Sequence, residues 1–150
     1  MSRANPFELL TAEHDLLRRN LGRAIELSRS RAESKESEAS LRSFLAALRQ
    51  HVRREEVTLY PLCERLFGGR ESAMAVLRGD HAAIDRAAAS LSPRSGRDGT
   101  PVAVRLTDLA RILDSHLARE ERVLFPLVAT RLTEADSTFL VRELRGVGRK

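Results

Sequence analysis

The fold of this chain is decided by a stretch that occurs twice, as HVRREEVTLYPLC at residues 51–63 and as HLAREERVLFPLV at residues 116–128. Seven of the thirteen positions are identical, among them the histidine, both glutamates and the proline. The remaining two histidines, His14 and His81, lie 67 residues apart, close to the 65-residue offset of the repeat, and each follows an acidic residue. The sequence therefore consists of two similar halves, each with a lone histidine and a His-x-x-x-Glu motif.

Glycine, proline and polar clusters divide the chain into long helical segments, and no window alternates in the manner of a β-strand. Asn5 is expected to cap the first helix, with Pro6 at its first position and Glu8 at its third. Helices are predicted over about 6–31, 37–67, 71–91 and 101–132, separated by turns at 34–37, 68–69 and 92–101, with a short fifth helix from Thr133 to about Gly146. This pattern predicts an all-α, up-down-up-down four-helix bundle over about 5–132 with a short extra C-terminal helix over about 133–146, in one domain spanning 1–150.

Composition excludes several classes of protein. The chain has 150 residues, a formal net charge of +5 and one cysteine, so no internal disulfide can form. It shows no apolar signal core near its start and no apolar run near the roughly 20 residues of a membrane span, which predicts a cytoplasmic protein with no membrane partner. Basic residues alternate with acidic ones and only six residues are aromatic, which argues against a nucleic-acid partner. The oligomeric state stays open.

The histidines fall on apolar helix faces when positions are assigned at about 100° per residue. With His51 at zero, Glu55 lies near 40°, among leucines and a phenylalanine of the same helix. The helix of His116 repeats this arrangement, with Glu120 and Leu127 within roughly 80° of the histidine. Because the lone histidines also lie in apolar stripes, all four histidines and two glutamates are expected to point at the bundle axis.

Each element has an ordinary structural explanation when it is taken singly. A lone histidine on an apolar face is usually a core residue, and a His-x-x-x-Glu pair is usually a surface ion pair. Burying two carboxylates and four imidazoles together without compensation would cost roughly several kcal/mol per charge, against a net stability of about 5–15 kcal/mol. A metal supplies the missing positive charge, and this N/O ligand set suits iron, manganese or zinc. The pattern predicts a dinuclear centre with the ligands His14, His51, Glu55, His81, His116 and Glu120.

The second glutamate of each repeat, Glu56 or Glu121, falls near 140° from its histidine and so outside the apolar stripe. We expect these two carboxylates either to hydrogen-bond to the ligands from outside or to pair with arginines on the surface.

Other repeat positions are expected to have structural roles. Pro61 and Pro126 lie inside their helices and should bend them, because each proline removes one backbone hydrogen bond. Tyr60 and Phe125 occupy the same repeat position, on a face away from the ligands, and are predicted to pack. Cys63 is predicted to be a small buried residue.

With its combined spacing of histidines and glutamates, the sequence resembles the hemerythrin-like, or HHE cation-binding, family over about residues 5–132. The resemblance implies a non-haem centre of two iron ions, oxo- or hydroxo-bridged, inside a four-helix bundle. By this resemblance Glu55 and Glu120 would bridge the irons, with His14 and His51 on one iron and His81 and His116 on the other. Members of the family are linked to oxygen or nitric oxide binding, iron sensing, repair of iron centres and peroxide decomposition.

One departure from the oxygen-carrying hemerythrins affects the expected function. Those proteins have two histidines at i and i+4 on the third helix, whereas here His81 is flanked by Leu77 and Asp85. Asp85 lies about 40° from His81 and is a candidate additional ligand, unless water takes that place. Open positions on both irons favour reaction with peroxide or nitric oxide over reversible oxygen carriage. Hydrogen peroxide decomposition, a catalase-like activity, is the most concrete expectation; the alternatives are non-catalytic oxygen, nitric oxide or iron binding or sensing, and a helical interaction module without metal.

Overall fold

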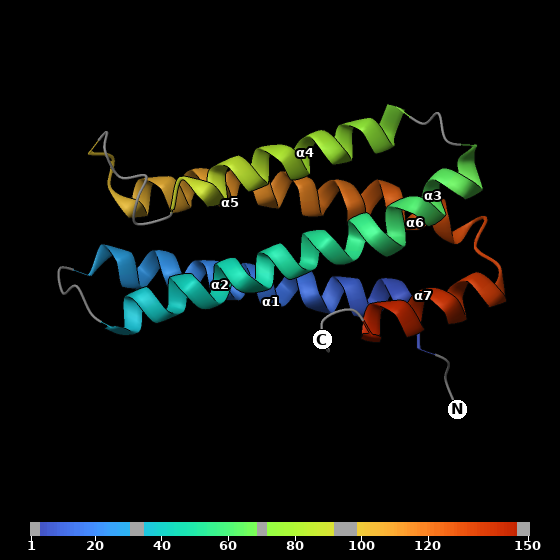
Figure 1. The fold of residues 1–150 in the computed structure, drawn as a ribbon, viewed down its shortest axis with the longest axis horizontal. Helices are drawn as coiled ribbons and strands as arrows, with labels where there is room; N and C mark the ends of the chain where they lie inside the picture. The colour runs from blue at the N-terminus through green and yellow to red at the C-terminus, as the bar shows by residue number, and fades with distance from the viewer. Residues whose placement is uncertain (1–3, 31–34, 69–71, 92–98, 147–150) are drawn as a thin grey trace.

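The computed structural model describes residues 4–30, 35–68, 72–91 and 99–146, and within these ranges all regular structure is helical. Four long helical stretches lie side by side (Figure 1). They are α1 (Pro6–Arg29); α2 (Lys35–Arg54), η1 (Glu55–Leu59) and α3 (Tyr60–Phe67); α4 (Ser72–Ala89); and α5 (Val102–Arg119), η3 (Glu120–Leu124) and α6 (Phe125–Ala129). The prediction of an all-α fold is confirmed, and the chain forms a helical bundle.

Local sequence explains where the described helices begin and end. Asn5 Oδ1 accepts a hydrogen bond from Phe7 N at 2.9 Å, and α3 ends at Gly68, whose φ of 81° suits a residue without a side chain. Of the expected turns, residues 34, 69 and 92–98 lie outside the described residues. Residues 35–37 belong to α2 instead of a turn.

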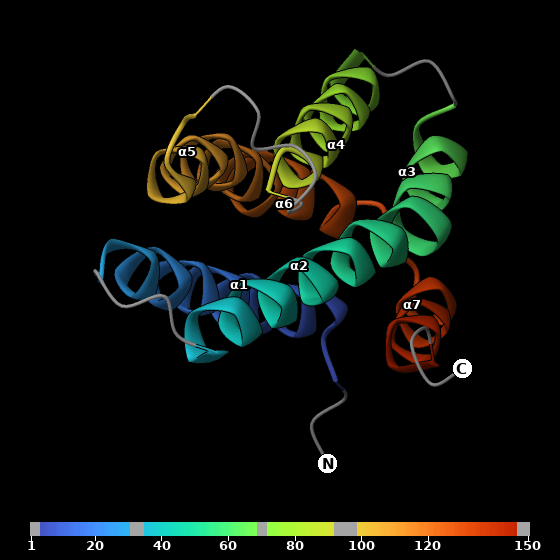
Figure 2. The same cartoon turned by 60° about the vertical axis from the view of Figure 1, so that its left-hand side comes forward.

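The short C-terminal helix, α7 (Glu134–Gly146), follows a reciprocal cap. Thr133 Oγ1 accepts a hydrogen bond from Asp136 N at 3.0 Å, and Asp136 Oδ2 accepts one from Thr133 N at 3.3 Å. The helix packs against α1 and η1 at the end of the bundle where the chain begins (Figure 2).

Buried apolar side chains form two clusters, one on each side of the histidines along the bundle axis. One cluster contains Leu17, and the other contains Leu10, so His14 lies between the two clusters along α1. On α4, His81 lies in the same way between Leu77 and Ile84. Each fully buried leucine contributes about 1.5–3 kcal/mol. The two clusters therefore hold the helices together on both sides of the histidines and keep water from them.

Two π-helical segments, η1 and η3, interrupt the helices that carry the repeat. The amide of Tyr60 donates to Glu55 O and that of Phe125 donates to Glu120 O, each a bond to the residue five positions back. A proline follows directly in both cases, and proline removes a backbone donor and crowds the preceding turn. Beyond η1, α3 leaves the direction of α2, with Pro61 at the bend (Figure 2).

These segments correct the face assignment of the residues that follow them. Each widened turn contains one additional residue, so later side chains are rotated back by about 100°. Leu127, predicted to face inward, is therefore 42% exposed, while Val128 is buried. The same rotation brings Tyr60 and Phe125 into the interior. The regular helical angle had placed both of them on a face away from the ligands. Cys63 is buried and unpaired, as predicted.

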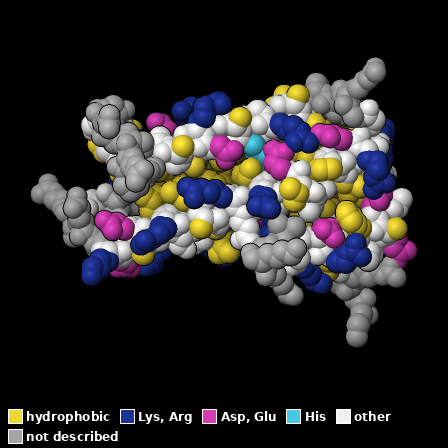
Figure 3. Space-filling model, in the orientation of Figure 1, with side chains coloured by type: hydrophobic (Ala, Val, Ile, Leu, Met, Phe, Trp, Pro, Cys, Tyr) yellow, Lys and Arg dark blue, Asp and Glu magenta, His cyan; other side chains and the backbone are white. Residues whose placement is uncertain are grey.

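Charge on the surface is dispersed. On the face shown in Figure 3, basic and acidic side chains are interspersed. Within the described ranges, no helix combines the length and the apolar character that crossing a bilayer requires.

Candidate metal centre

The structure brings the six predicted ligand residues together inside the bundle. None of these residues is more than 2% exposed. They form two groups that share both glutamates, and the potential ligand atoms of each group lie within 4.8 Å of one another: one group is His14, His51, Glu55 and Glu120, and the other is Glu55, His81, His116 and Glu120. Each group has the size and the donor atoms to hold one metal ion.

Glu55 faces both groups with different oxygen atoms. Its Oε1 lies 2.9 Å from His51 Nε2 and 3.5 Å from His14 Nε2. Its Oε2 lies 3.1 Å from His81 Nε2 and 3.8 Å from His116 Nε2. Glu120 Oε1 lies 3.4 Å from His14 Nε2 and 3.3 Å from His116 Nε2. The two carboxylates thus stand between the pairs of imidazoles.

Several of these buried atoms have no hydrogen-bond partner among the described residues. They are both ring nitrogens of His14, the Nε2 atom of His51 and the Oε1 atoms of Glu55 and Glu120. An unsatisfied buried polar atom costs about 1–3 kcal/mol. Imidazole nitrogens and carboxylate oxygens that lie close together with hydrogen bonds missing are suitable ligands for a cation, so the residues present fit a metal ion.

Charge inside the centre is balanced by protons when no cation is bound. Burial by itself lowers the pKa of His51, but the charge of Glu55 and hydrogen bonds to carboxylates outweigh burial and raise the pKa to about 10. Burial also lowers the pKa of His116, and its hydrogen bonds to Glu120 and Glu55 raise it to about 10. Burial raises the pKa of Glu55, yet the charge of His51 holds it well below its usual range. Metal binding must therefore displace protons.

Each histidine directs its Nδ1 toward a carboxylate outside the centre. The pairs are His51 with Glu13 at 2.8 Å, His81 with Glu56 at 2.7 Å, His116 with Asp80 at 3.2 Å, and His14 with Glu121 at 3.4 Å. A carboxylate only accepts hydrogen bonds, so the Nδ1 atoms of His51, His81 and His116 each carry a proton, and the Nε2 atoms face the interior. Each carboxylate also pairs with an arginine, and these are Arg54, Arg78, Arg119 and Arg18 respectively.

Two of these carboxylates, Glu13 and Asp80, were not assigned a role from the sequence. Both directly precede the lone histidine of their half, and each reaches a histidine on a neighbouring helix instead of its own neighbour. The repeated acidic residue was the signal that could have identified them. Glu56 and Glu121 lie outside the centre, where their face assignment placed them.

Tyr60 also belongs to the site, contrary to its predicted role in packing away from the ligands. Its hydroxyl donates to Glu120 Oε2 at 3.1 Å and lies 3.1 Å from His81 Nε2. Burial, together with the charges of Glu55 and Glu120, raises the pKa of Tyr60 far above its usual range, so the phenol stays protonated. Its repeat counterpart, Phe125, stacks on His14 with ring centroids 5.7 Å apart. The two halves of the centre therefore differ.

Asp85 is the one candidate ligand that the structure does not bring to the centre. Its side chain is exposed and belongs to neither group. The buried face of α4 continues from His81 to Ile84 and Ala88, so the i+3 position faces inward and the i+4 position of Asp85 faces solvent.

Comparison with known families agrees with this geometry. The family model described as Hemerythrin HHE cation binding domain matches residues 5–128, which is more than half of the chain. Searches of the curated proteins and of the solved structures return no significant match. The buried histidines and glutamates lie within the matched range, and the chain belongs to the hemerythrin HHE cation-binding domain family.

Proposed function

We propose that this chain is a non-haem di-iron protein that reacts with small oxidants, most concretely by decomposing hydrogen peroxide to oxygen and water. The observation that supports it is the pair of buried ligand groups that share two carboxylates and leave ligand atoms unpaired. Under this proposal His14 and His51 hold one iron, His81 and His116 hold the other, and Glu55 and Glu120 lie between them. Imidazole and carboxylate together suit iron.

The proposal includes the finer architecture. Residues 1–150 form one domain, in which the four long helical stretches make an up-down-up-down four-helix bundle. In such bundles metal sites are built from side chains of facing helices. Here each of the four stretches contributes one histidine to the interior.

Two irons in this position supply redox-active Lewis acids that bind and polarise peroxide. The chain's own residues prepare the site for that chemistry. Glu55 presents one oxygen to each group, which keeps the two positions close together. The hydroxyl of Tyr60 holds a proton at its Oη, where it donates a hydrogen bond to Glu120 and lies beside His81.

Room for a substrate follows from the small number of ligands. The position one turn before His81 is held by the buried apolar Leu77, and Asp85 one turn after it faces solvent. Each group therefore has two imidazoles and shares two carboxylates, which is fewer donors than a six-coordinate ion takes. Positions left over in this way admit a small oxidant.

The test is to load the protein with iron, to measure iron per chain by elemental analysis, and to follow oxygen release from hydrogen peroxide with an electrode. We expect about two irons per chain and faster release than from the same concentration of free iron. Glu120→Ala is expected to lose both. A protein with two irons that releases no more oxygen than free iron would contradict the catalytic proposal. Reversible spectral change with oxygen or nitric oxide in that protein would identify it as a binding or sensing protein.

A further inference from the structure

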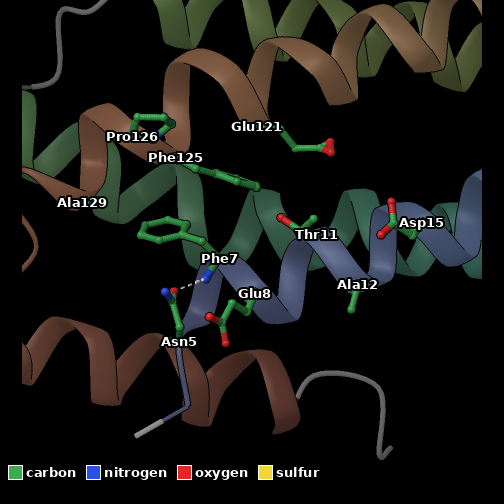
Figure 4. A pocket seen from close by; sticks show the side chains of 10 residues that line it. All are labelled: Asn5, Phe7, Glu8, Thr11, Ala12, Asp15, Glu121, Phe125, Pro126 and Ala129. Carbon is green, nitrogen blue, oxygen red and sulfur yellow. Dashed lines mark hydrogen bonds between the residues drawn. The ribbon is translucent and has the colours of Figure 1, made fainter. Parts of the chain in front are cut away.

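A surface pocket of about 490 Å³ lies between α1 and the end of the fourth helical stretch (Figure 4). The rings of Phe7 and Phe125 lie together in the pocket, with centroids 5.1 Å apart, and Thr11 and Glu121 lie to one side of them. Phe125 stacks on the His14 ring, and Glu121 Oε2 lies 3.4 Å from His14 Nδ1. Two side chains that line the pocket thus touch a ligand residue of the centre, and a single layer separates solvent from His14.

The sequence repeat explains why the His14 side and the His81 side of the centre differ at this pocket. The 67-residue offset relates Thr11 to Arg78, and the 65-residue offset relates Ala129 to Glu64. Arg78 pairs with Glu64 and covers the ring of Tyr60, with its guanidinium carbon 5.6 Å from the ring centroid. On the His81 side of the centre, the ion pair of Arg78 and Glu64 therefore fills the place that Thr11 and Ala129 leave open on the His14 side.

The imidazole nitrogens of the centre that have no hydrogen-bond partner in the described part of the chain lie on the same side of the centre as the pocket. His14 Nε2 and His51 Nε2 have no hydrogen-bond partner among the described residues, whereas His81 Nε2 contacts the hydroxyl of Tyr60 and the ring of His116. The imidazole nitrogens without such a hydrogen-bond partner thus lie on the side of the centre that the pocket adjoins.

The lining of the pocket carries a charge preference. It contains the carboxylates of Glu8, Asp15 and Glu121 and, among the described residues that line it, no basic side chain. Arg18 pairs with Asp15 and Glu121 from outside, which leaves the lining acidic on balance. Such a lining repels anions and does not hinder uncharged molecules.

We propose that this pocket is the access route of small uncharged molecules, such as hydrogen peroxide, oxygen or nitric oxide, to the His14 side of the centre. Phe125 is the specificity-determining residue, because its ring must move aside for a molecule to reach His14. The inference rests on the proposed function for the nature of the ligand, but the route itself can be tested without iron chemistry.

The first test uses the zinc-loaded full-length protein and dissolved oxygen as a paramagnetic probe in NMR. We expect stronger relaxation of the His14 and Phe125 ring protons than of the ring protons of Phe44, which is 0% exposed and does not line the pocket. The double variant T11R/A129E copies the ion pair that covers the ring of Tyr60 and should lower the effect at His14 to that at Phe44. The variant L16R/V123E adds the same charges at exposed positions outside the pocket and should match the wild type.

Equal relaxation at His14 and Phe44 in the wild type, or no change in T11R/A129E, would overturn the route. Should T11R/A129E fail to fold, as its circular dichroism would show, Phe125→Leu replaces it and is expected to increase the relaxation at His14. Failure to bind zinc would instead count against the metal centre itself, so the two proposals can fail separately.

The second test measures association rates in the iron-loaded protein by stopped-flow absorbance, with nitric oxide as the uncharged ligand and azide as the anion. Phe125→Ala should accelerate both ligands. Glu8→Gln with Asp15→Asn should accelerate azide by about tenfold and leave nitric oxide unchanged, because only the anion is repelled. Equal effects of the charge variant on both ligands would contradict the charge preference of the pocket.

Discussion

Two adjacent glutamates on one helix allow a sharp test of which side chains hold a metal. Glu55 is fully buried and presents one oxygen to each group of ligands. The Glu56 side chain is 29% exposed and contacts His81 Nδ1, at 2.7 Å, and Arg78. We expect Glu55→Gln to abolish tight metal binding at both positions and Glu56→Gln to weaken binding at one of them. The substitutions are the same in chemistry and differ by one position.

The size of the difference follows from these contacts. Loss of a hydrogen-bond partner of a metal ligand lowers metal affinity by about 10–100-fold. At a zinc concentration of about 100 times Kd, binding at each position stabilises the folded chain by about 2.7 kcal/mol, or about 5.4 kcal/mol for both positions. Glu56→Gln should therefore remove about 1.3–2.3 kcal/mol of this gain, and Glu55→Gln nearly all of the total of about 5.4 kcal/mol. For a chain of this size, these losses correspond to roughly 3–9 °C and 11–22 °C in the metal-induced rise of Tm.

The assay compares thermal unfolding by circular dichroism with and without zinc, and titration calorimetry supplies Kd and stoichiometry. Zinc is suitable because it accepts the same N and O ligands without redox chemistry. Equal loss of zinc from both variants, or full binding by Glu55→Gln, would refute the assignment of Glu55 to the interior of the centre and of Glu56 to its surroundings.

Three further predictions concern the metal-free and metal-bound states. Tyr60→Phe removes the hydroxyl that donates to the buried Glu120, so the free energy of unfolding of the metal-free protein, measured with urea, should fall by about 1.5–3 kcal/mol. Leu113→Ala opens a cavity in the apolar cluster remote from Tyr60 and should lower the free energy of unfolding by about 2–5 kcal/mol while zinc Kd stays unchanged; a large change in Kd would show that this cluster positions the ligands. The pKa values of His51 and His116 rise from 6.5 to about 10 on folding of the metal-free chain, so the stability they contribute is complete below about pH 6.5 and is lost as the pH rises through about 10. The zinc-induced rise in Tm should accordingly grow with pH over that window, and a decrease would contradict the displacement of protons by metal.

Much of the centre could be predicted from the sequence because a regular α-helix turns by a constant angle. Within α1, and from His51 to Glu55, that angle places each residue on a known face, and the repeat shows that the pattern occurs in both halves. The arithmetic fails where the helix is not regular. One additional residue in η1 rotates Tyr60 into the site, and one in η3 turns Leu127 out to solvent.

Contacts between helices could not be predicted in the same way. Glu13 and Asp80 each accept a hydrogen bond from a histidine of a neighbouring helix. The periodicity of one helix does not predict which side chain of a neighbouring helix a residue will contact. Asp85 shows the opposite error. Its angle of about 40° from His81 suggested a ligand, but the buried face of α4 contains Ile84, and Asp85 faces solvent.

The sequence by itself determined the helices, the inward faces of their regular parts and the six buried histidines and glutamates, because these depend on spacing along one chain. Only the tertiary structure decided the side chains that surround them and the difference between the two halves. Tyr60 beside His81, Phe125 over His14 and the pocket at Thr11 depend on how separate helices pack against one another. Packing is set by side-chain volume and local helix geometry, which a repeat of polar ligands does not encode.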